Sequence, residues 1–243
     1  MQKRAIVTGG RGGIGAATVE RLAGVGVEVH ALDIDPEIQT APPTGAAFGH
    51  VCDVTDGAQI ERVCAAILAD GPVSILVNCA AAIATGDAEV CSLDDYDKVM
   101  AVNVRGPWLL ARQMLAGMRE QGDGVIINLS STAGIRPSRN RLAYSTSKAA
   151  IRQLTRSIST DFGQYGIRAN TVCPGPIDTA LWRASRPAGM SAEKHAEAAI
   201  EGLALKRLGT VDEIAAMIEF LVSDAASFVT GATIAADGGR TLH

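Results

Sequence analysis

Short apolar segments alternate with longer helix-like segments along almost the whole chain of 243 residues. The apolar segments are rich in Val, Ile and Leu without polar alternation, which is typical of strands covered on both faces. Strands are predicted at residues 4–7, 27–32, 47–52, 75–78, 124–129, 168–172 and 233–236, and helices near 14–24, 57–69, 95–119, 144–164 and 211–222. This order predicts an α/β fold, a doubly wound parallel sheet of about seven strands with helices on both faces.

Residues 181–206 fit this alternation poorly. They are rich in Ala, Arg and Glu and contain Pro187, Gly189 and Gly202. We therefore expect a mobile insertion or a short helical lid over a site. The rest of the chain shows no linker or repeat, so residues 1–243 are predicted to form a single domain.

Composition excludes several classes of protein. A net charge of -4 argues against nucleic acid as the main partner. The longest uncharged run, residues 71–86, is shorter than the roughly 18–20 apolar residues that a membrane span requires, and no secretory signal is recognisable at the N-terminus. Five cysteines without a CxxC pair indicate free thiols in a reducing, cytoplasmic compartment. Four scattered histidines give no reason to expect a metal.

The first predicted strand runs into a glycine-rich turn that contains Gly9, Gly13, Ile14 and Gly15, and a helix follows. Glycines let the backbone approach a pyrophosphate closely, and the start of the helix supplies free N–H groups. Glycines also serve plain tight turns, but the strand–turn–helix order favours cofactor binding. Arg11 within the turn is either a phosphate ligand or a solvated residue.

Asp33 ends the second predicted strand, 18 residues after Gly15. This spacing suits a carboxylate that accepts hydrogen bonds from the hydroxyls of a ribose. A carboxylate at this place repels a 2′-phosphate, so the sequence favours NAD over NADP. The alternative is that Asp33 only opens a solvated turn with Asp35 and Pro36.

Tyr144 and Lys148 lie four residues apart in a predicted helix and therefore share one face. A nearby ammonium lowers the pKa of a phenol and fits it to exchange a proton with an alcohol or carbonyl oxygen. The alternative is a surface pair on an amphipathic helix. Upstream, Ser130 and Ser131 follow the strand at residues 124–129, where a hydroxyl faces the ligand crevice of an open sheet or caps a turn.

In order and spacing, these motifs resemble the short-chain dehydrogenase/reductase family over essentially the whole chain. Asn103 matches the family's structural asparagine, 28 residues before Ser131, and Tyr144 follows 13 residues after Ser131. Cys79 and Ala81 depart from the family pattern, because they stand where an asparagine and a glycine are usual. The further matches are Asp53 and Val54 at the adenine, Asn78 at the end of the fourth strand, and Ile177 and Thr179 at the nicotinamide.

The resemblance implies a Rossmann-type oxidoreductase with a catalytic tetrad. Tyr144 would be the general acid or base, and Ser131 would polarise the substrate oxygen. Lys148 would lower the pKa of Tyr144 and bind the nicotinamide ribose, and Asn103 would anchor a water that links Lys148 to solvent. The implied NAD-binding residues are Gly9, Arg11, Gly13, Ile14, Gly15, Asp33, Asp53, Val54, Asn78, Tyr144, Lys148, Ile177 and Thr179.

The sequence leaves the substrate open. A secondary alcohol or cyclic diol, interconverted with its ketone, is favoured over the alternative of a 3-oxoacyl thioester, and a non-catalytic sensor of NAD is the distant alternative. Arg136, Arg139 and Arg141 precede Tyr144 and are expected to be exposed loop or interface charges, unless one of them, Arg141 being nearest, contacts an anionic substrate. His195 is expected to be a solvated helix residue. The family resemblance also implies a homotetramer.

Overall fold

The computed structural model describes residues 2–187 and 189–242, and a parallel sheet of seven strands forms its centre. The strand order is β3-β2-β1-β4-β5-β6-β7, and every neighbouring pair is parallel. The strands are β1 (Arg4–Thr8), β2 (Glu28–Asp33), β3 (Phe48–Val51), β4 (Ile75–Asn78), β5 (Gly124–Leu129), β6 (Ile167–Pro174) and β7 (Thr233–Ala236). The chain reverses its direction of travel across the sheet between β1 and β4, which confirms the predicted doubly wound, Rossmann-type fold.

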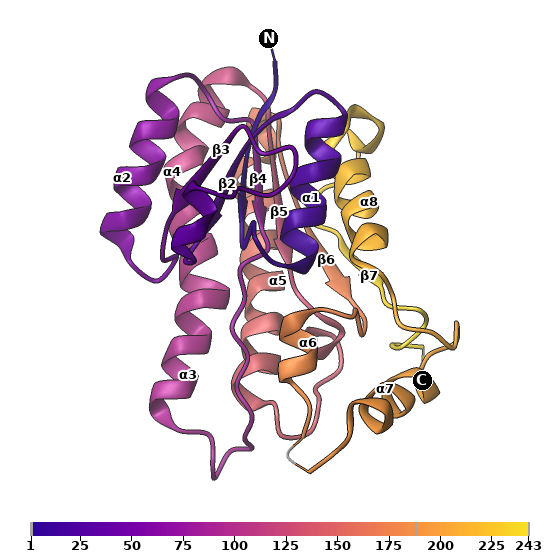
Figure 1. Ribbon diagram of the computed structural model, residues 1–243. Helices are drawn as coiled ribbons and strands as arrows, with labels where there is room; N and C mark the ends of the chain where they lie inside the picture. Colours follow the sequence, from indigo (N-terminus) through magenta and orange to yellow (C-terminus); the bar gives the residue numbers. More distant parts are fainter. Residues whose placement is uncertain (1, 188, 243) are drawn as a thin grey trace.

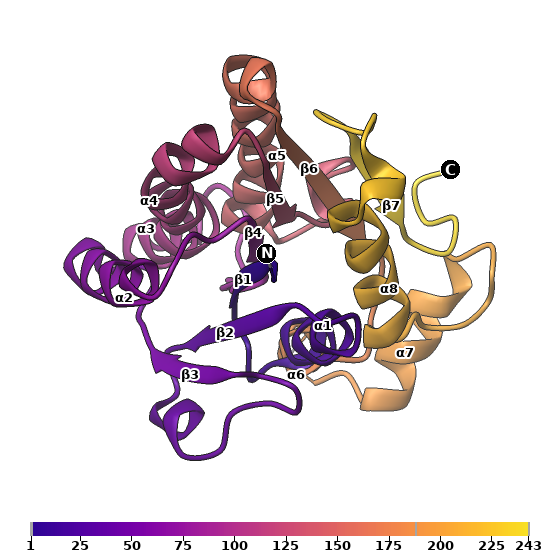
Figure 2. The ribbon, with the colours of Figure 1, turned by 90° about the horizontal axis from the view of Figure 1, so that it is seen from above.

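Helices cover both faces of the sheet. Figure 2 shows α1 (Gly13–Gly24) and α8 (Val211–Val222) on one face, with α2 (Gly57–Ala69), α4 (Gly106–Gln121) and α5 (Leu142–Phe162) on the other. Successive side chains of a strand point to opposite faces. Val7 accordingly packs in the core under α1 and α8, and Ile6 packs in the core under α2 and α4. This two-sided burial explains why the strands lack polar alternation.

The prediction of one long helix near residues 95–119 is wrong, because this stretch forms two helices. α3 (Leu93–Met100) begins where Ser92 Oγ accepts a hydrogen bond from the backbone N–H of Asp95 at 3.1 Å. A π-helical turn at Ala101–Arg105 then leads into α4. Pro107, which has no N–H, cannot donate to the carbonyl of Asn103, so the regular helical ladder is interrupted here.

Residues 181–206 form two short helices below the carboxyl ends of the strands in Figure 1, namely α6 (Ala180–Ala184) and α7 (Ala192–Glu201). Thr179 and Ser191 cap them, accepting backbone N–H bonds from Trp182 at 3.2 Å and from Lys194 at 3.3 Å. Short 3₁₀ turns occur at Pro36–Gln39, Thr132–Gly134, Gly163–Tyr165 and Asp224–Ala226. Within the described residues, no helix has the length and apolar character needed to cross a membrane.

Candidate active site

The turn between β1 and α1 forms one wall of a cavity of about 590 Å³ at the carboxyl edge of the sheet. A side chain at Gly9 would place its Cβ 2.9 Å from the backbone nitrogen of Ala80, and one at Gly15 would collide with the carbonyl of Gly9. Because the glycines carry no side chains, the backbone of this turn is exposed to the cavity. The first turn of α1, which begins here, contains no acidic residue. Such a cradle fits the pyrophosphate of a dinucleotide. The sequence-predicted residues that line the cavity are Gly9, Gly13, Ile14, Gly15, Asp33, Asp53, Val54 and Thr179.

Two backbone N–H groups hold the carboxylate of Asp33 at the end of β2. Arg11 N donates to its Oδ2 at 3.0 Å, and Asp35 N donates to its Oδ1 at 3.1 Å. Asp33 also lines the cavity, so its orientation toward a ribose is set by the turn itself. Arg11 lies outside the cavity wall, and its guanidinium pairs with Asp35 at 3.4 Å and Glu37 at 2.8 Å. The structure therefore uses Arg11 to close the turn.

Asn78 is buried and does not line the cavity, unlike the other predicted residues of this region. Its Nδ2 donates to Asn128 Oδ1 at 2.8 Å, and Asn128 Nδ2 donates to Thr155 Oγ1 at 2.9 Å. This chain of polar side chains joins β4, β5 and α5 beneath the site. Asn78 thus holds the end of β4 in place and does not itself form part of the cavity surface.

A second cavity of about 410 Å³ adjoins the first and contains the predicted catalytic side chains. Ser131, Tyr144, Lys148 and Ile177 line it. The two cavities share six lining residues, namely Ile14, Cys79, Ala81, Ile83, Thr179 and Leu181. The two cavities are therefore contiguous, so the glycine-walled cavity opens onto the hydroxyl groups of Ser131 and Tyr144.

The end of β5 and the start of α5 are locked together by reciprocal hydrogen bonds. Lys148 Nζ donates to the carbonyl of Leu129 at 2.8 Å, and Ser130 Oγ donates to the carbonyl of Lys148 at 2.6 Å. Gly134 allows this approach, because a Cβ there would collide with the backbone of Lys148. Lys148 is 2% exposed, so its ammonium is held deep in the protein.

Opposing influences act on the pKa of Tyr144, and the net effect is to raise it. Burial raises the pKa of the phenol, while a side-chain hydrogen bond with Ser131 and the positive charge of Arg141 lower it. Lys148 Nζ lies 5.7 Å from the centre of the Tyr144 ring and bonds the carbonyl of Leu129 instead of the phenol oxygen. In this structure Ser131 and then Arg141 lower the pKa of Tyr144, while the ammonium of Lys148 is held at the carbonyl of Leu129.

Asn103 lies in the π-helical turn, 1% exposed, and lines neither cavity. Its Oδ1 accepts from Ala82 N at 2.8 Å, and its Nδ2 donates to Ala82 O at 2.9 Å and to Ser147 Oγ at 2.9 Å. The side chain is thus committed to bracing the loop after β4 against α5. That loop supplies Ala81 and Ala82 to the dinucleotide cavity.

The segment at residues 181–206 covers the catalytic cavity. Trp182 of α6 stacks on His195 of α7, with ring centres 4.4 Å apart and an interplanar angle of 12°. Both rings line the cavity. The expectation that His195 is a solvated helix residue is therefore wrong, because stacking on Trp182 turns the imidazole inward. Arg141 Nη2 donates to the carbonyl of Ser185, which ties the segment to the loop before α5.

Two further residues, Arg240 and Cys79, line the catalytic cavity although the sequence did not predict this position for them. Arg240 lines the catalytic cavity from the C-terminal region, after a turn in which Gly238 and Gly239 adopt φ angles of +61° and +82°. The Asp-Gly-Gly motif indicates a turn, but it does not indicate that the turn brings Arg240 to the cavity. Cys79 lines both cavities, and burial raises the pKa of its thiol to about 12. Within the described part of the chain, no group of three or more His, Cys, Asp or Glu side chains could hold a metal ion.

Comparisons with known proteins agree with this arrangement. Residues 9–241 match the family model described as enoyl-(acyl carrier protein) reductase. An uncharacterized oxidoreductase of Thermotoga maritima is 39% identical, with 98% of this chain and 97% of that protein covered. The 2-(R)-hydroxypropyl-CoM dehydrogenase of Xanthobacter autotrophicus is 36% identical, with 99% of both chains covered. The crystal structure of levodione reductase superposes with a TM-score of 0.92 at 33% identity, over 99% of this chain and 98% of that chain.

The burial of Lys148 predicts a pH dependence of stability. Burial lowers the pKa of Lys148 from 10.5 to about 8. Between these pH values the unfolded chain binds the proton more readily than the folded chain, so the free energy of unfolding falls as the pH falls from 10.5 to 8, by up to about 3 kcal/mol. Lys148→Met removes this contribution. In urea unfolding experiments between pH 10.5 and 8, the free energy of unfolding of Lys148→Met is therefore expected to rise relative to that of the wild type as the pH falls.

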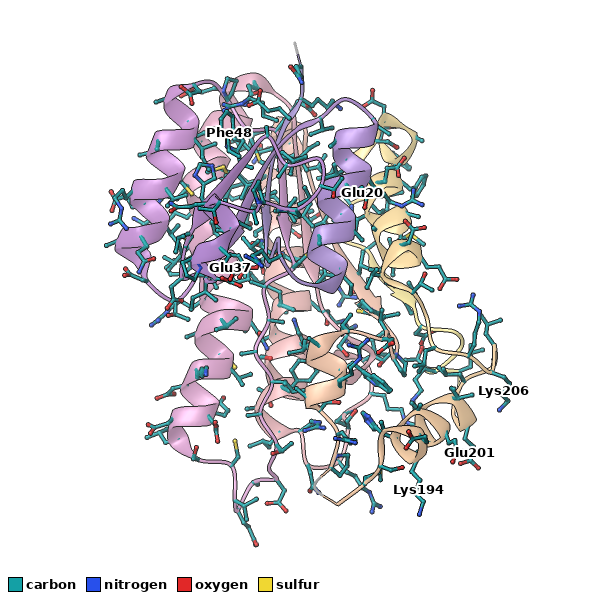
Figure 3. The ribbon with its side chains drawn as sticks, viewed as in Figure 1. Glu20, Glu37, Phe48, Lys194, Glu201 and Lys206 are labelled. Atoms are coloured by element: carbon teal, nitrogen blue, oxygen red, sulfur yellow. The ribbon has the colours of Figure 1, made fainter. Side chains whose placement is uncertain are left out.

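Lys194→Met is the matched control for this experiment, since Lys194 projects from α7 away from the protein body in Figure 3. A difference between Lys148→Met and wild type that stays constant from pH 8 to 10.5 would contradict the buried-ammonium assignment.

Proposed function

The chain belongs to the short-chain dehydrogenase/reductase family, and on this premise we propose that it interconverts a secondary alcohol or cyclic diol and its ketone with NAD(H). The chain is an oxidoreductase, and relatives carry the names hydroxypropyl-CoM dehydrogenase and levodione reductase. One observation carries the proposal. The Ser131–Tyr144 pair faces a cavity that is contiguous with a glycine-walled dinucleotide cradle.

The protein's own groups have distinct tasks in this reaction. When bound, a nicotinamide cofactor accepts or supplies the hydride. The glycine turn and Asp33 hold the pyrophosphate and ribose, and Ile177 and Thr179 line the wall nearest the catalytic groups. Lys148 and Tyr144 complete that end of the site. Trp182 and His195 close over the substrate and exclude water.

Tyr144 moves the proton at its phenol oxygen. With its pKa raised by burial, the phenol carries its proton at neutral pH, which is the form that donates to a ketone oxygen during reduction. Oxidation of an alcohol requires the phenolate, which Ser131 and Arg141 favour by hydrogen bonding and charge. Ser131 also holds the substrate oxygen beside Tyr144. The role of Asn103 in a water relay is part of the proposal, alongside its bracing of the loop.

The segment at residues 181–206 is proposed to act as a substrate lid on a single catalytic domain. Trp182 and His195 of this segment line the catalytic cavity, and the carbonyl of Ser185 accepts a hydrogen bond from Arg141, which supports this role. A cytoplasmic location is also proposed, on the ground that all five cysteines are free thiols.

Replacing Tyr144 by Phe keeps the ring and removes the proton carrier. Turnover is expected to fall by about 10²- to 10⁴-fold. Binding of NADH, followed by its fluorescence, is expected to persist because the glycine cradle and Asp33 are unchanged. Tyr165→Phe, at an exposed position, is the control. Near-normal turnover of Tyr144→Phe in a screen of alcohols and ketones would defeat the assignment.

The carboxylate of Asp33 predicts a preference for NAD. Repulsion of a 2′-phosphate is expected to make kcat/KM for NAD at least about 100-fold higher than for NADP. Asp33→Asn is expected to narrow this ratio, whereas Asp35→Asn, outside the cavity, is the matched control. A wild-type preference for NADP would overturn the Asp33 argument and would support reduction of a 3-oxoacyl thioester instead.

A homotetramer is proposed, with α4 and α5 at one interface and β7 with α8 at another. Exposed apolar side chains on these helices support it, since Trp108 of α4 is 46% exposed and Phe220 of α8 is 45% exposed. Light scattering is expected to give four times the chain mass of 25.1 kDa. Trp108→Glu is expected to shift the distribution to smaller species. A wild-type monomer would refute the assembly without touching the chemistry.

A further inference from the structure

We propose that the substrate carries a small oxyanion, a carboxylate or sulfonate, a few bonds from the carbon that is oxidised or reduced, and that Arg141 binds this group. The inference rests on the proposed function and names the substrate class of the same site. Arg141 caps the start of α5, three residues before Tyr144, and its half-buried side chain lines the catalytic cavity.

The hydrogen bonding of Arg141 is incomplete. A guanidinium has five N–H donors. The one hydrogen bond of this side chain among the described residues runs from Nη2 to the carbonyl of Ser185, and Nη1 is buried without a hydrogen-bond partner in the same part of the chain. Buried donors of a charged group are normally paired, because leaving them unpaired is costly. Arg141 therefore has N–H groups at the cavity wall that remain available to donate hydrogen bonds to a ligand.

The charge of the cavity wall points the same way. The charged side chains that line it are Arg141, Lys148 and Arg240, and no Asp or Glu is present among the described lining residues. The chain as a whole has 26 acidic and 22 basic residues, so this imbalance is local and not compositional. A cavity of one sign with low-dielectric walls attracts the opposite charge.

Neither Arg141 nor Arg240 forms an ion pair with a described acidic side chain, although several other arginines do. Arg21, for example, pairs with Asp212 and Glu219 at 2.7 Å each. The pyrophosphate of a dinucleotide does not account for the two cations, because Arg141 and Arg240 line the catalytic cavity and not the glycine-walled cavity. Both cations therefore face the substrate end of the site without an acidic partner, and an anionic substrate would supply one.

Arg141 is also close to the reacting groups. Burial raises the pKa of Tyr144 and lowers that of His195, and the charge of Arg141 acts on both groups, opposing the first effect and adding to the second. An oxyanion on this guanidinium would lie in the cavity that Trp182 and His195 also line, and the reacting carbon of the substrate would lie toward Tyr144 and Ser131. The cavity of about 410 Å³ limits the substrate to a small molecule.

Calorimetry with matched probes tests the proposal. The probes are 4-oxopentanoate, 3-oxobutane-1-sulfonate, which has the same two-carbon spacer, and the neutral methyl ester of the first. NAD is present throughout, and because it cannot reduce a ketone, binding is measured without turnover. The wild type is expected to bind at least one anion about 10- to 100-fold more tightly than the ester. Which anion binds distinguishes carboxylate from sulfonate.

Arg141→Gln is expected to bring the ratio of anion to ester affinity close to one, and any effect through Tyr144 alters all three probes alike. Arg141→Lys, which retains charge but loses the planar fork, is expected to keep part of the preference. Arg139→Gln, at an exposed position of the same loop, is the matched control and keeps the full ratio.

A wild type that binds the ester as tightly as both anions overturns the proposal, and so does an Arg141→Gln protein that retains the preference. The wild-type measurement decides the matter even where a variant fails to fold. Failure of the proposed function itself would show separately, as turnover that survives in Tyr144→Phe.

Discussion

The clamp between the end of β5 and the start of α5 is the interaction on which the site depends. Lys148 reaches back to the carbonyl of Leu129, and Ser130 reaches forward to the carbonyl of Lys148, both in buried surroundings. Hydrogen bonds are strongest where water does not compete and most costly to lose there. The clamp therefore fixes the one helix that carries Tyr144 relative to the one strand that delivers Ser131. Gly134 makes the approach possible by leaving space for the helix backbone.

The same burial creates an electrostatic cost that the surroundings partly offset. Lys148 loses its hydration, which lowers its pKa to about 8, and the phenol of Tyr144 has its pKa raised for the same reason. Arg141 and Ser131 act in the opposite direction on Tyr144. The site thus holds a phenol and cations in buried surroundings, where each charge has a larger effect than it would in water.

Several side chains expected to touch a cofactor or proton path also hold the framework together. Asn78 and Asn103 are buried, and their amide groups join β4 and its following loop to β5 and α5. Arg11 pairs with acidic residues of the next turn. These polar residues follow from the doubly wound topology, because the carboxyl ends of several strands meet at one edge and their loops must be fastened to one another.

The sequence by itself determined the order of strands and helices, the glycine cradle, Asp33 and the Ser131, Tyr144 and Lys148 set, because each depends on local pattern and spacing. The helix break before Pro107 was within reach of local rules but was hidden by the continuous apolar pattern on both sides. The inward turn of His195, the position of Arg141 beside Tyr144 and the arrival of Arg240 at the same cavity were decided only by the tertiary structure. A charged side chain has the same local sequence signature in solvent and at a cavity wall, and only the packing of distant segments distinguishes the two.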